Sequence, residues 1–286
     1  MEEQLRQWFL DWINTVVYLP DAILEKEWYW QGYDEGLRMS FLRVQEELRS
    51  LDSELALLRR QTGKGFTSAQ TILSGYHQAY WELRLIYAAV DNQLADRIPK
   101  EKEWSLRDIL YHLIETEWAF YGLFRYTFRY AGTKPEWPQG KAPESFMTEH
   151  FEIEGQFRES IFTGDITTML GFYDQLHQRV LLGLKEFPDG RLSDPIFFWE
   201  PQPMPARFRL IRFESHLHQH TIQAEKTLGQ LKVNTTEIKH LLRNCAQTFA
   251  EVEAGLVFFP DDAGDLIRKR LDSLQKLSGA VRLILQ

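Results

Sequence analysis

Apolar residues recur at intervals of three and four along most of the chain, and this spacing predicts amphipathic helices. Polar and charged residues fill the positions between them, as expected for helices that bury one face. The predicted helices cover residues 2–18, 36–60, 67–96, a stretch from 105, 165–187, a stretch ending near 231, and two stretches within the last 54 residues. The pattern therefore predicts an all-α protein with four helices at its centre.

A coiled-coil-like seam runs through the predicted helix at 36–60, where the apolar positions alternate in steps of four and three. These positions are Leu37, Phe41, Val44, Leu48, Leu51, Leu55 and Leu58. Similar spacing recurs at 238–256 and 267–281, and it places Cys245 on a core face. Such seams predict that the outer helices pack against one another or across a homodimer, since unpaired seams would expose large apolar patches.

Helix-breaking residues suggest how the chain is divided. The segment 61–65 contains Gly63 and Gly65, and we place a domain boundary there. We expect an N-terminal helical extension over 1–64, a four-helix bundle over 65–232 and a C-terminal helical pair over 233–286.

Two further segments interrupt the helical pattern within the bundle. Residues 132–155 contain three prolines and predict a loop, in which His150 is expected to face solvent. Residues 188–205 are rich in proline and aromatic residues and are compatible with a pocket wall or a cap on the bundle. The aromatic residues concerned are Phe197, Phe198 and Trp199.

The composition narrows the class of protein. A net charge of −8 offers no basic surface for nucleic acid, and no run of about 18 apolar residues suggests a membrane span. The single cysteine excludes an internal disulfide and a cysteine-rich metal site, and it is compatible with a reducing cytoplasm. The acidic N-terminus has no signal-peptide pattern. We therefore expect a soluble cytoplasmic protein that binds neither nucleic acid nor membrane.

Three of the eight histidines lie within residues 216–220 of one predicted helix. His216 and His220 are one turn apart beside the apolar face, so the two rings can hold one ion, whereas His218 points the opposite way. Neutral imidazoles suit zinc, nickel, copper or iron. The alternative is an ordinary helix with partly buried, hydrogen-bonded histidines.

A second predicted helix carries another candidate ligand. Ser105 and Asp108 form a capping-box pattern that predicts a helix start, and His112 follows at the edge of the apolar stripe. Glu117 projects into that stripe, where a carboxylate is costly unless it is paired, protonated or near a metal. Glu115 is expected on the solvated side.

With these two segments in view, about residues 66–232 resemble the DinB-like (DinB/YfiT) superfamily. The first segment has Trp104-Ser105 before the helix with Tyr111-His112-Leu113, Glu115 and Glu117. The second has a His-x-x-x-His-x-x-Gln core at His216, His220 and Gln223. The resemblance implies an up-and-down four-helix bundle whose metal ligands project inward from facing helices.

The resemblance also implies the ligands: one histidine from the second bundle helix and two from the last, here His112, His216 and His220. Three histidines leave open positions on the ion, as in catalytic sites. The implied cofactor is a divalent transition metal, with zinc preferred on ligand type and nickel next. Related proteins include thiol-dependent transferases, metal-dependent isomerases and hydrolases.

Two hypotheses follow. The first is a metal-dependent enzyme, a transferase that activates a low-molecular-weight thiol, with Glu117 as general base or hydrogen-bond partner of a ligand; a metal-dependent hydrolase is a variant of it. The second is a non-catalytic metal-binding or interaction protein whose outer helices make the functional contacts. The second hypothesis predicts no open coordination position and no substrate pocket.

Overall fold

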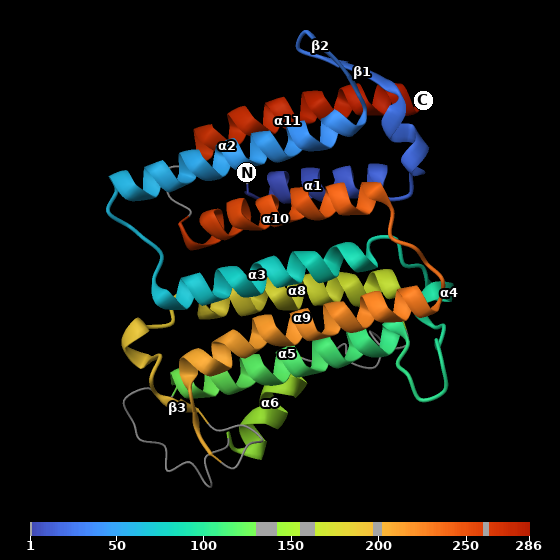
Figure 1. Ribbon diagram of the computed structural model, residues 1–286. Coiled ribbons are helices and arrows are strands. Elements are labelled where there is room, and N and C mark those ends of the chain that lie inside the picture. Colours follow the sequence, from blue (N-terminus) through green and yellow to red (C-terminus); the bar gives the residue numbers. More distant parts are fainter. Residues whose placement is uncertain (1, 130–141, 155–163, 197–201, 260–262) are drawn as a thin grey trace. The chain divides into compact units, whose positions relative to one another are not determined.

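The structure is a computed structural model that describes residues 2–129, 142–154, 164–196, 202–259 and 263–286 (Figure 1). The described residues are mostly helical, with two short two-stranded antiparallel sheets, and the all-α prediction is confirmed. The aromatic residues proposed as a pocket wall, Phe197, Phe198 and Trp199, lie outside these ranges. No helix in the described ranges is both long and apolar enough to cross a membrane.

The chain forms two compact units. One unit combines residues 1–66, 84–89 and 233–286, so that the segments expected at the two ends of the chain belong together. The other unit contains residues 67–83 and 90–232 and carries both histidine segments.

The histidine-bearing unit is a four-helix bundle with shorter elements around it (Figure 1). Its main helices are α3 (Ser68–Tyr87), α5 (Leu106–Arg129), α8 (Ile166–Leu184) and α9 (Ala206–Gln230). The shorter elements are α4 (Asn92–Ala95), α6 (Glu144–Glu154), η3 (Asp189–Arg191), β3 (Pro195–Ile196) and β4 (Met204–Pro205). The four-helix core expected for the central segment is confirmed.

The directions of the four helices depart from the strict alternation of an up-and-down bundle. α5 and α8 begin at the same end, because Arg107 Nη1 donates to Gly164 O at 2.8 Å, just before α8 starts. At the other end, Gln70 Nε2 near the start of α3 donates to Lys185 O at the end of α8, at 3.1 Å. α5 and α8 therefore run parallel, which the long connection between them allows.

Side-chain caps begin two of these helices where the sequence predicts them. Asp108 N donates to Ser105 Oγ at 3.1 Å, and Ser105 N donates to Asp108 Oδ2 at 3.0 Å, which completes the predicted capping box. Asp165 accepts a hydrogen bond from Thr168 N at 2.6 Å and caps α8. Because such caps satisfy backbone N–H groups that have no partner within the helix, they determine where α5 and α8 begin.

Two local expectations for this unit are wrong. The helix expected over 67–96 ends at Tyr87, and Asp91 then caps the separate helix α4 by accepting a bond from Leu94 N at 2.8 Å. The segment expected to be a loop contains α6, and His150 on this helix is buried with its ring 5.7 Å from that of Trp118. Pro143, directly before α6, marks the start of this helix.

The other unit pairs the outer helices within one chain. It contains α1 (Glu2–Val16), η1 (Asp21–Glu25), β1 (Glu27–Trp30), β2 (Tyr33–Gly36), α2 (Arg38–Gln61), α10 (Glu237–Phe258) and α11 (Gly264–Leu285). α2 packs on α10 and α11, and α1 also packs on both of these helices. Cys245 is buried in this core, where its Sγ lies 3.3 Å from Phe41 O.

Candidate metal centre

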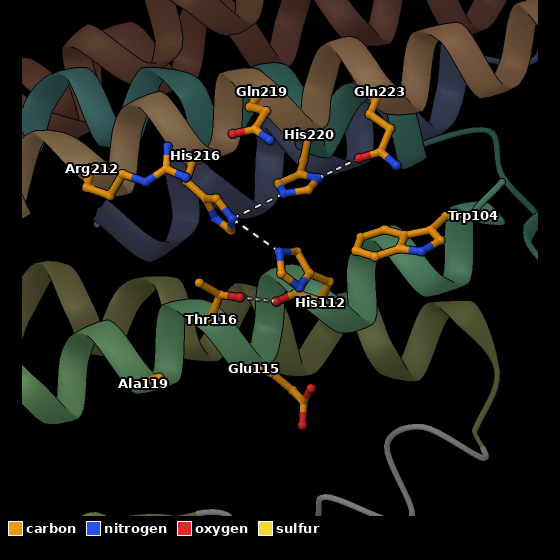
Figure 2. Close-up of a pocket in the computed structure, with 10 residues that line it drawn as sticks. All are labelled: Trp104, His112, Glu115, Thr116, Ala119, Arg212, His216, Gln219, His220 and Gln223. Atoms are coloured by element: carbon orange, nitrogen blue, oxygen red, sulfur yellow. Dashed lines mark hydrogen bonds between the residues drawn. The ribbon is translucent and has the colours of Figure 1, made fainter. Parts of the chain in front are cut away.

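Three histidines converge between α5 and α9, at the positions expected from the sequence (Figure 2). His112 Nε2 lies 3.2 Å from His216 Nε2, and His220 Nε2 lies 3.1 Å from the same atom. His216 and His220 are one turn apart on α9, and His112 faces them from α5. The potential ligand atoms of the three rings all lie within 4.8 Å of one another.

Each of the three rings is held in its neutral form. Burial lowers the pKa of His216 to about 3, with smaller contributions from the neighbouring rings and Arg212. Burial is also the main cause of the lowered pKa values of His112 and His220. At neutral pH the site therefore presents uncharged imidazoles, the form in which histidine binds a metal.

Hydrogen bonding orients the His220 ring. Its Nδ1 donates to Gln223 Oε1 at 2.8 Å, so the neutral ring directs the lone pair of Nε2 at the other histidines. His216 Nδ1 is buried without a hydrogen-bond partner. A cluster of nitrogen lone pairs on neutral rings fits a divalent transition ion, and the Gln223 contact is the kind of support that metal-bound histidines receive.

A pocket of about 690 Å³ opens at this cluster. It is lined by Trp104, His112, Glu115, Thr116, Ala119, Arg212, His216, Gln219, His220 and Gln223. The Trp104 ring lies nearly parallel to that of His220, with centroids 6.2 Å apart. Among the residues that the structure describes, no carboxylate, thiol or further imidazole joins the three-histidine group. An ion held by the three histidines would therefore be accessible from the pocket.

Glu117 lies in the bundle core and does not line this pocket. Its side chain is 1% exposed, as the sequence predicts for an inward position, and Tyr76 donates a hydrogen bond to its Oε1. Burial raises the pKa of Glu117 to about 8, and a hydrogen bond from Tyr173 partly offsets the rise. The carboxyl group is therefore paired and protonated at neutral pH, two of the three conditions considered from the sequence.

The remaining histidines of the bundle occupy other environments. His218 is partly exposed, with its Nδ1 3.4 Å from Glu82 Oε2, and its predicted separation from the metal pair is confirmed. His77 and His177 are fully buried, and His77 Nδ1 lies 2.8 Å from His177 Nε2. Both side chains lie in the core of the bundle.

Glu115, expected on the solvated side, lines the open pocket with its carboxylate directed away from the histidines (Figure 2). Arg212 and Gln219 also line the pocket, and the sequence analysis gave them no role. Their spacing contained a usable signal, because Arg212 precedes His216 by one helical turn and Gln219 precedes Gln223 by the same interval.

Residues 76–224, just over half of the chain, match the model of the DinB superfamily. The chain belongs to the DinB superfamily. The matched range contains all three histidines of the candidate metal centre, and it runs from α3 to α9. Comparisons with curated proteins and with solved structures found no match. The membership supports a metal-binding DinB-like protein and leaves its reaction to be inferred from the pocket.

Proposed function

We propose that this DinB-superfamily protein is a metal-dependent enzyme that transfers a low-molecular-weight thiol to an electrophilic substrate. His112, His216 and His220 hold a divalent transition ion, zinc by ligand type and nickel as the next choice. One observation carries the proposal: three neutral imidazoles converge at a pocket of about 690 Å³ without a fourth side chain joining them in the described ranges.

When bound, the ion supplies a Lewis acid that lowers the pKa of a coordinated thiol or water. The chain's own residues position the reactants. Gln223 keeps Nδ1 of His220 protonated and Nε2 available as a ligand. The Trp104 ring lies nearly parallel to that of His220 and lines the same pocket, where it can contact the apolar part of a substrate. The thiol comes from a substrate, because Cys245 is buried in the other unit and burial raises its pKa to about 12.

The catalytic role predicted for Glu117 remains a prediction. As general base it would have to act from the core, where its carboxyl group contacts Tyr76. Replacing Glu117 with Gln separates the roles: a general base would lose turnover, whereas a core hydrogen-bonding group would leave turnover and metal content close to wild type.

The pocket also helps to distinguish the proposed transferase from two alternative functions, a non-catalytic interaction protein and a hydrolase. A non-catalytic interaction protein predicts a closed site without space for a substrate, and the open pocket favours an enzyme instead. A hydrolase would use the same histidines with water as the nucleophile. Thiol consumption therefore distinguishes the transferase from the hydrolase.

The proposal is tested by elemental analysis followed by a thiol screen. We expect about one divalent metal ion per wild-type chain and a large loss of metal in His216→Ala and His220→Ala. His218→Ala is the matched control on the same helix and should keep the metal. Metal-loaded protein incubated with an electrophile and bacillithiol, mycothiol or glutathione should consume thiol, and Cys245→Ser should remain active. Equal metal content in the wild type and the His216→Ala/His220→Ala double variant would overturn the assignment of the metal ligands. Hydrolysis of the electrophile without thiol consumption would favour the hydrolase.

A further inference from the structure

Arg212 lies at one end of the metal pocket, on the same face of α9 as two of the histidines. It precedes His216 by four residues and His220 by eight, so the three side chains follow one another at intervals of about one turn, or about 6 Å along the axis. Figure 2 shows its guanidinium group beside His216, with Trp104 beside His220 at the opposite end. The pocket thus has a cationic end, a metal-binding centre and an aromatic end.

The charge of Arg212 is not neutralised by an ion pair with any described residue. Among the described residues, its guanidinium group makes a long hydrogen bond, from Nη1 to Ser215 Oγ at 3.4 Å. Arg270, in contrast, pairs with Glu47 at 2.8 Å and with Glu54 at 2.6 Å. Glu115 also lines the pocket, but Figure 2 shows its carboxylate on the α5 side, apart from Arg212.

The Arg212 guanidinium group and the three histidines line the same pocket. The positive charge of Arg212 contributes to the lowered pKa values of His112, His216 and His220. A divalent ion on three neutral imidazoles adds charge of the same sign beside Arg212. A partly desolvated pocket with two unneutralised cationic groups favours an anionic ligand.

We propose that Arg212 binds a carboxylate group on the substrate that reaches the metal centre, and so selects carboxylate-bearing thiols over neutral ones. This inference rests on the proposed function and adds the substrate class. The carboxylate faces Arg212, the sulfur faces the three histidines, and the rest of the molecule extends toward Trp104. Arg212 acts as a specificity residue, because its planar fork pairs with a carboxylate through two parallel hydrogen bonds.

Ligand binding to cobalt-loaded full-length protein tests the proposal without relying on turnover. Co²⁺ occupies zinc-type sites, and its visible absorption reports a change of ligands. The probes are 3-mercaptopropionate and 3-mercaptopropan-1-ol, which differ in the carboxylate. Wild type should bind the carboxylate probe about tenfold to a hundredfold more tightly, the range expected for a hydrogen-bonded ion pair. In Arg212→Gln this preference should fall below about threefold, and Arg212→Lys should retain part of it.

Arg207→Gln is the matched control, because Arg207 is exposed on the same helix and does not line the pocket. It should keep the wild-type preference. Equal binding of the two probes by wild type, or an unchanged preference in Arg212→Gln, overturns the proposal while leaving the metal site intact. Loss of Co²⁺ from Arg212→Gln would show that the residue supports the metal site and would also overturn it. If wild type binds no Co²⁺, the metal-dependent function itself fails.

Discussion

The hydrogen bond between Gln223 and His220 is expected to influence the affinity of the candidate centre for a metal ion. Gln223 Oε1 accepts from His220 Nδ1 at 2.8 Å, and this contact selects the tautomer whose Nε2 faces the other rings. We expect Gln223→Leu to weaken metal binding by about tenfold to a hundredfold, as for other residues that orient metal-bound histidines. Competition with a chelator of known affinity measures the change.

Gln219→Leu is the matched control, because Gln219 lines the same pocket but makes no hydrogen bond to a histidine in the described ranges. It should leave the affinity within about threefold of wild type, within the small effects typical of surface substitutions. Equal affinities of the Gln223→Leu protein and the wild type would show that the tautomer of His220 is determined in another way.

Glu117 makes stability depend on pH in the opposite sense to most carboxylates. Its pKa rises from 4.5 to about 8 on folding, so between these values the folded carboxyl is protonated and the unfolded one is ionised. Unfolding then releases a proton, and raising the pH lowers the free energy of unfolding by up to about 1.4 kcal/mol per pH unit. Below pH 4.5 both states are protonated and the effect disappears.

Urea unfolding at pH 5.5 and pH 7.5 checks this expectation. Wild type should lose stability over this interval relative to Glu117→Gln, whose amide does not titrate. The difference between the two proteins isolates Glu117 from the other titrating groups. A pH dependence that is the same in both proteins would show that Glu117 is ionised in the folded state.

At the scale of elements, the helices were predictable because apolar periodicity and caps act locally. The capping box at Ser105 and Asp108 begins α5 as predicted, and the inward position of Glu117 followed from its phase on that helix. Local signals were weaker for short elements. The β1–β2 hairpin turns at Gln31 and Gly32, which both have positive φ, and its four-residue strands are too short for a clear alternating pattern.

The candidate site was predictable only in part, because its members come from separate helices. Spacing on one helix could pair His216 with His220, but joining His112 to them required the family resemblance. The burial of His150 depends on how α6 meets Trp118, a contact between segments that periodicity cannot show. The spacing of Arg212 from His216 indicated a shared face of α9, and the structure shows that this face lines the pocket.

Two glycines of α8 offer a comparison of helix propensity with packing. A Cβ at Gly171 would meet nothing within 4 Å, so Gly171→Ala should raise stability by about 1 kcal/mol through helix propensity alone. A Cβ at Gly183 would lie 2.8 Å from Tyr121 Cε2 on α5, so Gly183→Ala should lower stability by about 1 to 3 kcal/mol.

Thermal unfolding of the two variants measures both effects under one set of conditions. The opposite signs are the essential result, since both substitutions add the same methyl group to the same helix. If Gly183→Ala is as stable as Gly171→Ala, the close approach of α5 and α8 at Tyr121 is not a constraint on the fold.

At the scale of the whole molecule, the N- and C-terminal segments depend on each other. α1 and α2 pack on α10 and α11, and Arg6 Nε donates to Glu253 Oε1 at 2.6 Å across these segments. The apolar seam of α10 is buried along most of its length. Its members include Ile238, Leu242, Cys245, Phe249, Val252 and Leu256. Neither segment covers its apolar face alone, which is why the paired arrangement needs both ends of the chain.

Deleting residues 1–60 tests this dependence. The deletion removes α1 and nearly all of α2, and it exposes the seams of α10 and α11 as a continuous apolar surface. We expect the truncated protein to aggregate or to self-associate, because large exposed apolar patches favour association with other molecules. Light scattering coupled to size-exclusion chromatography distinguishes these outcomes from a monomer. A truncated chain that stays monomeric, with an unchanged midpoint of thermal unfolding, would mean that α10 and α11 do not need α1 and α2, and that their buried seams contribute little to stability.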